Sequence, residues 1–227
     1  MRRPWRRRAG ALAALVVLVA VAVAIAVVVE RVGPERAVCP GRDSAAVVLD
    51  PGHGGNDPGA VNEAAGLVER DLTLVIARRV ASILEADGYA VALTRDDNAT
   101  TLGNSARGRI ANACGALVFV SIHLNSVSDP DPNHTLALWA TERKDLAFAR
   151  VMQATLAGAL RPGTNLGDGG VREFESGALL RARMPAALVE AVFVSNPEEA
   201  ARLAEGTSAR RDEIAAAIAA GVEAWLR

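Results

Sequence analysis

The sequence predicts an α/β fold: a mainly parallel, twisted sheet with helices on both faces, in a single domain behind an N-terminal transmembrane helix. Short, continuously apolar runs are typical of strands that are buried on both faces of a sheet. Longer segments with apolar residues at helical spacing alternate with these runs, as in layered α/β domains. The length of 227 residues fits one such domain with an appendage.

Residues 1–8 are basic, and residues 9–29 are apolar and uncharged. A run of about 20 such residues can cross a bilayer as a helix, and the arginines before it favour a cytoplasmic N-terminus. A cleaved signal peptide is the alternative, although its apolar core usually has only about 7–15 residues. We therefore expect a single-pass anchor in the cell membrane and an extracytoplasmic domain, or a secreted domain if the segment is cleaved.

The charge balance argues against a nucleic-acid partner. The formal net charge is −1, but five of the 25 basic residues are the arginines at the N-terminus. The remaining 20 basic residues stand against 26 acidic ones, which gives the rest of the chain a net charge of −6. A protein that binds nucleic acid normally carries a basic surface, and none is indicated here.

Residues 30–44 contain glycine, proline and several charges, which predicts a linker before a domain at residues 45–227. The two cysteines of the chain are Cys39 in this linker and Cys114. In an extracytoplasmic domain such a pair can form a disulfide. Two unpaired thiols are the alternative, and the sequence leaves both open.

The first strand is predicted at residues 45–49, and a loop rich in glycine and proline follows it to about residue 66. In α/β proteins, reactive side chains lie in loops at the carboxyl ends of strands. His53 lies in this loop and is therefore the first candidate for chemistry. The loop lacks the spacing of a phosphate-binding loop, but a histidine exposed on a turn remains an alternative for this residue taken alone.

A helix is predicted at residues 68–86, a strand at 89–94, a short helix at 104–113 and a strand at 116–122. Glu69 lies in the first turn of the first helix, where a negative charge favours the helix dipole whether or not it has a further role. His123 directly follows the strand at 116–122. A second histidine thus comes at the carboxyl end of a second buried strand.

The C-terminal half continues the alternation of strands and helices. His134 lies in a turn-rich segment and is interpreted as a surface residue. The predicted elements are an edge strand at 135–140, a helix at 146–160, a glycine-rich loop at 161–170 that could line a cleft, a strand at 186–194, a helix starting at 196–199 and a terminal helix at 210–226.

Glu190 interrupts the apolar strand at 186–194. An ionised carboxylate is costly to bury without a partner, so such a residue is normally paired or linked to a metal. The carboxyl ends of parallel strands meet at one edge of a sheet, which places His53 and His123 near each other and near Glu69. Two histidines and one carboxylate form a ligand set of catalytic zinc.

Several motifs together resemble the zinc-dependent N-acetylmuramoyl-L-alanine amidases of the type 3 family. They occur in the family's order and span nearly all of residues 45–227. The motifs are Val48-Leu49-Asp50-Pro51-Gly52-His53-Gly54-Gly55, Glu69-Arg70-Asp71-Leu72, Leu93-Thr94-Arg95-Asp96, Arg107 with Ala111-Asn112, Ser121-Ile122-His123 with Asn125, and residues 185–190 with Ser195-Asn196-Pro197-Glu198.

The resemblance implies one zinc ion held by His53, Glu69 and His123, with Glu190 as the catalytic carboxylate. It implies peptidoglycan as the substrate and cleavage of the amide between N-acetylmuramic acid and L-alanine of the stem peptide. Zinc lowers the pKa of its bound water to about 7 and polarises a carbonyl. Glu190 would accept the proton of that water and return it to the leaving amine.

Further residues are candidates for orienting a ligand or contacting substrate, and these are Asp50, Asn125, Arg95 and Arg107. Asp50 could orient a zinc-binding imidazole through its other nitrogen, or it could close the loop. Leu124 and Ala191-Val192 depart from the family pattern beside site residues, which affects the shape of the groove more than the metal site.

Two other functions stay open at this stage. The chain could be a catalytically silent protein that senses or binds the cell wall, or a zinc hydrolase that acts on another amide. The complete set of His53, Glu69, His123 and Glu190 favours the enzyme, since a binding module needs no carboxylate beside an open metal. The sequence does not identify a protein activator.

Overall fold

The computed structural model describes residues 37–140, 145–204 and 209–227. A compact unit comprises Val38–Arg227, which is close to the domain predicted at residues 45–227. The predicted basic terminus, the membrane segment at residues 9–29 and residues 30–36 of the linker lie outside the described residues. Within the described ranges, no helix combines the length and the apolar character needed to cross a membrane.

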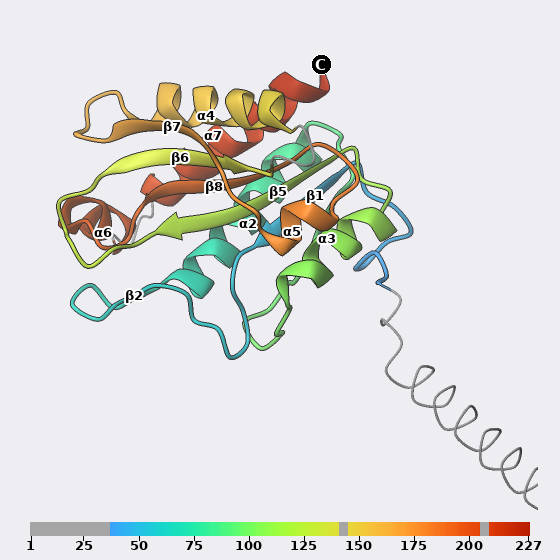
Figure 1. Cartoon of the computed structure of the whole chain (residues 1–227), viewed down its shortest axis with the longest axis horizontal. Coiled ribbons are helices and arrows are strands. Elements are labelled where there is room, and N and C mark those ends of the chain that lie inside the picture. The colour runs from blue at the N-terminus through green and yellow to red at the C-terminus, as the bar shows by residue number, and fades with distance from the viewer. Residues whose placement is uncertain (1–36, 141–144, 205–208) are drawn as a thin grey trace, which may run out of the picture. The chain divides into compact units, whose positions relative to one another are not determined.

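The centre of the domain is a six-stranded sheet of order β4-β1-β5-β8-β6-β7 (Figure 1). β4, β1, β5 and β8 run parallel to one another, and β6 is antiparallel to β8 but parallel to β7. The mainly parallel sheet is therefore confirmed. The strands are β1 Val47–Pro51, β4 Val91–Leu93, β5 Val118–Asn125, β6 His134–Trp139, β7 Gly167–Glu173 and β8 Ala186–Phe193.

Two predictions for the C-terminal half were wrong. β6 is not an edge strand, because β7 pairs with it on the side away from β8. The predicted loop at 161–170 ends inside β7, whose sequence GDGGVRE has a single apolar side chain and so lacks the usual signal of a strand. A small ribbon of β2 (Val61–Asn62) and β3 (Leu67–Val68) was also not foreseen.

The helices are α2 Glu69–Ala86, α3 Asn104–Ala113, α4 Leu146–Leu160, α5 Gly177–Arg181, α6 Pro197–Ala204 and α7 Ala209–Leu226. The bounds of α2, α3, α4 and α7 and the start of α6 were predicted to within a residue, and the five-residue α5 was not predicted. The apolar residues of α2 and α4 recur at helical spacing over several turns, and this is a strong signal in a sequence. α5 has too few turns to show such a period.

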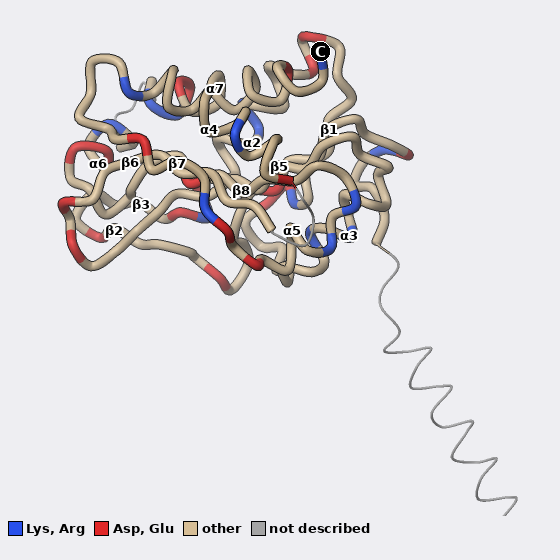
Figure 2. The backbone as a smooth tube through the Cα atoms, turned by 45° about the horizontal axis from the view of Figure 1, so that its top comes forward, with Lys and Arg blue, Asp and Glu red and all other residues tan. Residues whose placement is uncertain are grey.

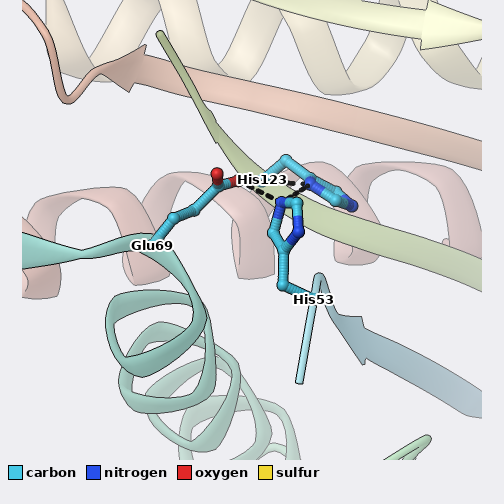
Figure 3. A group of neighbouring side chains, drawn as sticks. All are labelled: His53, Glu69 and His123. Atoms are coloured by element: carbon cyan, nitrogen blue, oxygen red, sulfur yellow. Dashed lines mark hydrogen bonds and ion pairs between the residues drawn. The ribbon is translucent and has the colours of Figure 1, made fainter. Parts of the chain in front are cut away.

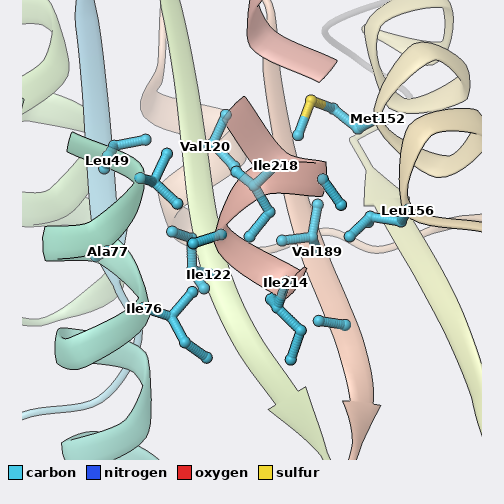
Figure 4. Packing of buried hydrophobic residues seen from close by; sticks show 14 of the residues in the cluster. Leu49, Ile76, Ala77, Val120, Ile122, Met152, Leu156, Val189, Ile214 and Ile218 are labelled. Carbon is cyan, nitrogen blue, oxygen red and sulfur yellow. The ribbon is translucent and has the colours of Figure 1, made fainter. Parts of the chain in front are cut away.

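Helices cover both faces of the sheet, as predicted. Leu49, Val120 and Val189 point to one face, where α2, α4 and α7 cover them with side chains such as Ile76 and Ile218 (Figure 4). Successive residues of a strand point to opposite faces. The alternate strand residues are equally buried and face α3 and α5, and this second face holds the polar network described below.

Cys39 and Cys114 form a disulfide. The backbone of Cys114 also accepts a hydrogen bond from the amide of Ala45, over 3.1 Å. The chain before β1 is thereby attached to the C-terminal end of α3. Of the two possibilities that the sequence left open for the cysteines, the structure shows the disulfide.

Candidate active site

The candidate site lies where the carboxyl ends of β1, β5 and β8 meet. His53 follows β1 by two residues, and His123 and Glu190 face each other in the register between β5 and β8. Glu69 is the first residue of α2, and the amide of Glu69 donates to Ala60 before the β2–β3 ribbon, over 2.8 Å. Three separate elements thus bring His53, Glu69 and His123 together (Figure 3).

The three side chains point polar atoms at a common centre. Glu69 Oε1 lies 3.0 Å from His53 Nε2 and 3.2 Å from His123 Nδ1. The two imidazole nitrogens are 3.2 Å apart, and all three ligand atoms lie within 4.8 Å of one another. Two imidazoles and a carboxylate match the donor chemistry of a catalytic zinc site, in which three protein ligands leave a position open.

Glu69 is held in its ionised form although it is buried. Burial alone would raise the pKa of this carboxyl, but the hydrogen bonds and charges of His123 and His53 hold the pKa well below its usual range. The amides of Ala60 and Leu124 also donate to its two oxygens, over 2.9 and 3.0 Å. A fixed, ionised carboxylate beside two imidazoles is a suitable receptor for a cation.

Leu124, which departs from the family pattern, contributes to the site through its backbone. Its amide is one of the donors to Glu69, and its side chain is buried at 2% exposure. The substitution is therefore compatible with the orientation of Glu69. Leu124 also lines the pocket, so its side chain affects the shape of the groove.

The backbone of His53 is unusual. With φ at 63°, it has the one positive φ of a non-glycine residue in the described ranges, a conformation that is disfavoured for side chains with a Cβ. Arg107 Nη2 donates to the carbonyl of His53 over 2.7 Å. Asp57 Oδ2 lies 2.9 Å from His53 Nδ1. These contacts hold both the backbone and the ring of His53.

Asp57, rather than Asp50, orients the imidazole of His53. Burial lowers the pKa of His53, but hydrogen bonds to Glu69 and Asp57 outweigh burial and raise the pKa overall. Sequence reasoning missed Asp57, although it lies only four residues after His53 in the same loop. Its proximity in the sequence was the available signal.

Asp50 has an indirect role. It is fully buried and accepts hydrogen bonds from Arg107 Nη1 over 2.7 Å and from Ser121 Oγ over 2.6 Å, as well as from Thr94. Burial opposes ionisation, but the charge of Arg107 and these hydrogen bonds keep the pKa of Asp50 below its usual value. Asp50 fixes Arg107, which in turn contacts the carbonyl of His53. Of the two roles that the sequence left open for Asp50, these contacts fit closure of the loop rather than direct orientation of an imidazole.

The other candidates from the sequence divide into two groups. Arg95 is buried and donates to the carbonyls of Pro51 and Gly52, so it supports the loop from behind. Arg107 is also buried and donates to Asp50 and to the carbonyl of His53, whereas Asn125 is partly exposed and lines the pocket.

Glu190 differs from Glu69 in its surroundings. Its Oε2 is buried and has no hydrogen-bond partner among the residues that the structure describes. Burial is the main reason that the pKa of Glu190 rises to about 7. A carboxyl with this pKa exchanges protons readily near neutral pH, as a general acid or base must.

The four residues open into one cavity of about 520 Å³. Asn104, Asn125 and Ser126 add polar groups to its wall, and Leu188 and Phe174 add apolar ones. Phe174, Ser176 and Ala178 were missed because the segment around α5 had no signal in the sequence. His134 and the predicted cleft-lining residues 161–170 do not line this cavity. His134 instead packs against the ring of Phe193, with centroids 4.7 Å apart.

Comparisons with known proteins agree with the fold and identify the family. Residues 47–224 match the sequence model of a family described as N-acetylmuramoyl-L-alanine amidase. The chain is 31% identical over 185 residues to N-acetylmuramoyl-L-alanine amidase LytC of Bacillus subtilis, with 80% of this chain and 35% of LytC covered. It therefore spans about a third of that relative.

Solved structures share the architecture. N-acetylmuramoyl-L-alanine amidase AmiC2 of Nostoc punctiforme superposes with a TM-score of 0.71 at 36% identity, over 79% of this chain and 96% of that one. The CwlD amidase of Clostridioides difficile, solved in complex with the GerS lipoprotein, has a TM-score of 0.71 at 27% identity and covers 81% of this chain and 98% of that chain.

Proposed function

The chain belongs to the N-acetylmuramoyl-L-alanine amidase family, and from this premise we propose that it is a zinc-dependent peptidoglycan hydrolase. The proposed reaction is hydrolysis of the amide between the lactyl group of N-acetylmuramic acid and L-alanine of the stem peptide. The observation that carries this proposal is the convergence of His53, Glu69 and His123 on one centre, with Glu190 in the same cavity.

His53, Glu69 and His123 would hold the zinc ion. When bound, zinc supplies Lewis acidity, which polarises the scissile carbonyl and makes water acidic enough to lose a proton near neutral pH. Asp57 orients His53, and the amides of Ala60 and Leu124 orient Glu69. The ligand atoms are thus positioned by contacts that exist within the chain itself.

Glu190 serves as the proton carrier. As a general base it accepts a proton from the attacking water, whose oxygen forms the new bond to the carbonyl carbon. It then gives the proton to the nitrogen of L-alanine as the C–N bond breaks, so the products are a carboxylic acid and a free amine. The raised pKa of Glu190, about 7, suits a group that must both accept and release a proton.

The cavity wall offers groups for an anionic glycopeptide. The side-chain amides of Asn104 and Asn125 can bind peptide carbonyls or carboxylates. The site is open at the sheet edge, which fits a substrate that is part of a polymer. The residues of this wall, rather than the metal ligands, would determine which stem peptides the enzyme prefers.

We further propose that the enzyme works outside the cytoplasm, attached to the membrane through residues 9–29 or secreted if that segment is cleaved. The Cys39–Cys114 disulfide supports this location, because disulfides persist in oxidising compartments. A protein activator is a further possibility to be tested by adding candidate lipoproteins to the assay.

The decisive experiment incubates the full chain, in neutral detergent with zinc, with purified peptidoglycan and identifies the products by mass spectrometry. Stem peptides with a free L-alanine amino terminus are expected. Glu190→Gln should lower the rate by about 10³-fold or more, since it removes the group that moves the proton. Glu198→Gln, on the exposed surface of α6, is the matched control and should leave the rate unchanged.

Three outcomes would contradict the proposal in different ways. Products from another bond would indicate a zinc hydrolase of different specificity. Binding of peptidoglycan without products from the zinc-loaded chain would favour the catalytically silent wall-binding protein. An unchanged rate in Glu190→Gln would remove Glu190 from the mechanism.

A further inference from the structure

A second cavity, of about 310 Å³, lies between the C-terminal ends of α3 and α5. Three arginines and no acidic residue line it. The lining residues are Arg109, Asn112, Leu180, Arg181, Ala182 and Arg183. We call this cavity the arginine pocket. Nothing in the proposed amidase reaction uses it.

The three arginines of this pocket have no hydrogen-bonded or ionic partner for their side chains within the described ranges. The buried arginines Arg107 and Arg210, by contrast, are paired, with Asp50 at 2.7 Å and with Glu199 at 2.7 Å. Three cations that share one cavity repel one another. A bound anion would relieve this repulsion.

The pocket is built by close packing of α3 against α5. A Cβ at Gly108 would lie 2.4 Å from the carbonyl oxygen of Ala178 and 2.9 Å from the amide of Ala182. Only a glycine allows the two segments to approach so closely. This approach brings Arg109, the next residue of α3, to the residues that follow α5.

Asn112 holds the loop after α5 in place. Its Nδ2 donates to the carbonyl of Arg181 over 2.7 Å, and its Oδ1 accepts from the amide of Arg183 over 2.8 Å. Asn112 lies one helical turn after Arg109, and residues three apart share a helix face. The same face of α3 therefore carries Arg109 and the amide of Asn112, which holds the backbone of Arg181 and Arg183.

Arg181 and Arg183 project away from the core. Ala182 between them is extended, with φ −63° and ψ 140°, and its side chain is 1% exposed. Arg181 at the end of α5 and Arg183 after it are both exposed, on either side of the buried Ala182. The tube view shows basic positions of α3 and α5 gathered at this end of the domain (Figure 2).

We propose that the arginine pocket binds the phosphate group of a phosphate ester. Guanidinium groups match the oxygens of phosphate with paired, charge-assisted hydrogen bonds. A carboxylate carries one negative charge, which is fewer than the three positive charges of the pocket. The cavity of about 310 Å³ also has room for a substituent attached to the phosphate. Both features favour an ester over a simple carboxylate.

The arginine pocket is separate from the candidate active site. Asn104 at the start of α3 and Ala178 in α5 line the catalytic cavity, while Arg109 and Arg181, further along the same helices, line the second one. α3 ends at Ala113, and the next residue, Cys114, forms the disulfide with Cys39. A phosphate ester bound in the arginine pocket leaves the catalytic cavity free.

The test uses the full chain in neutral detergent and isothermal titration calorimetry. The probes are inorganic phosphate and glycerophosphoglycerol, the soluble headgroup of an anionic phospholipid, each at constant ionic strength set with sodium chloride. The variant Arg181→Gln/Arg183→Gln is compared with Arg150→Gln/Arg172→Gln. The control removes two exposed arginines elsewhere on the domain and so changes the net charge equally.

We expect saturable binding of one ligand per chain, weakened roughly tenfold or more in Arg181→Gln/Arg183→Gln and little changed in the control. Binding of both probes means that the phosphate itself is recognised, whereas binding of glycerophosphoglycerol alone identifies a lipid-type diester. The proposal is overturned if neither probe binds saturably, or if the two double variants bind alike, which would indicate general charge attraction or binding at the metal site.

Discussion

Glu190 lies in the catalytic cavity, and burial of its ionised carboxylate lowers the free energy of unfolding. Its Oε2 is buried without a hydrogen-bond partner among the described residues, and burial raises its pKa from 4.5 to about 7. Between these two pH values the folded protein binds more protons at Glu190 than the unfolded chain does. The contribution of Glu190 to the free energy of unfolding therefore falls as the pH rises from about 4.5 to about 7.

Glu190→Gln should accordingly stabilise the metal-free protein above neutral pH. We expect about 1–3 kcal/mol in the free energy of unfolding at pH 8, and little difference at pH 4.5, where the carboxyl is protonated in the folded state. Chemical unfolding in the presence of a chelator at both pH values measures this. A difference of the same size at both values would show that the ionisation of Glu190 is not its cause.

The Asp50–Arg107–His53 chain of contacts predicts an effect on metal affinity. Arg107 donates to Asp50 and to the carbonyl of His53 with different nitrogens of one guanidinium. In Arg107→Lys the charge remains, but a single ammonium cannot reproduce this fork. We expect zinc affinity to fall about 10–100-fold, as is typical when groups behind a metal ligand are changed.

Competition with a chromophoric chelator measures this zinc affinity. Arg78→Lys is the matched control, because Arg78 makes an exposed pair with Asp96 at 2.7 Å. Thermal unfolding of the metal-free variants shows whether both are folded. Equal zinc affinities in folded Arg107→Lys and wild type would mean that His53 keeps its position without Arg107.

At the scale of helices, two glycines predict opposite results for the same substitution. Gly108 lies in α3, where an added Cβ would meet the carbonyl oxygen of Ala178 at 2.4 Å. Gly158 lies in α4 with nothing within 4 Å of its Cβ position. Gly108→Ala should cost about 1–3 kcal/mol because α5 must move, whereas Gly158→Ala should stabilise by about 0.5–1 kcal/mol.

Urea unfolding of both variants checks this pair. The arginine pocket depends on the same α3–α5 contact, so Gly108→Ala should also weaken phosphate binding there. Stabilisation of the protein by Gly108→Ala would show that α5 is free to shift, and the close approach would then not define the pocket.

The same elements show what the sequence can predict. α2 and α4 were predicted well because their apolar residues repeat over several turns. β7 and α5 were missed, since one is nearly devoid of apolar residues and the other has five residues. The spacing of residues within a segment does not indicate which distant strand it pairs with, so the inner position of β6 in the sheet was also missed.

The candidate site was easier to predict than its supports. His53, His123 and Glu190 stand out because each is a polar residue in or beside a buried strand, and the family resemblance added Glu69. The partners behind them, such as Asp57, depend on the path of the loop after β1. That path follows from tertiary contacts like that of Arg107 with the carbonyl of His53, which no sequence spacing reveals.

At the scale of the whole domain, the two cavities use opposite ends of α3 and α5. The catalytic cavity lies at the carboxyl ends of the strands, and the arginine pocket lies between the C-terminal ends of α3 and α5. α3 is held at its start by the Arg107–Asp50 pair and at its end by Cys114. The position of this helix thus links the two cavities.

The Cys39–Cys114 disulfide is expected to stabilise the domain. It closes a loop with a sequence separation of 75 residues, and restricting the unfolded chain in this way is worth about 2–4 kcal/mol. Cys39→Ser/Cys114→Ser should therefore lower the melting temperature by roughly 5–15 °C. Reductant should lower the melting temperature of the wild type by a similar amount and leave the variant unchanged.

Differential scanning calorimetry with and without reductant measures both effects. Because the disulfide lies at the end of α3 away from Glu190, the variant should retain the amidase rate of the wild type at temperatures where both are folded. If reductant lowers the melting temperature of wild type and variant equally, its effect does not come from this disulfide. If the folded variant loses its amidase activity, the disulfide affects the catalytic cavity through α3.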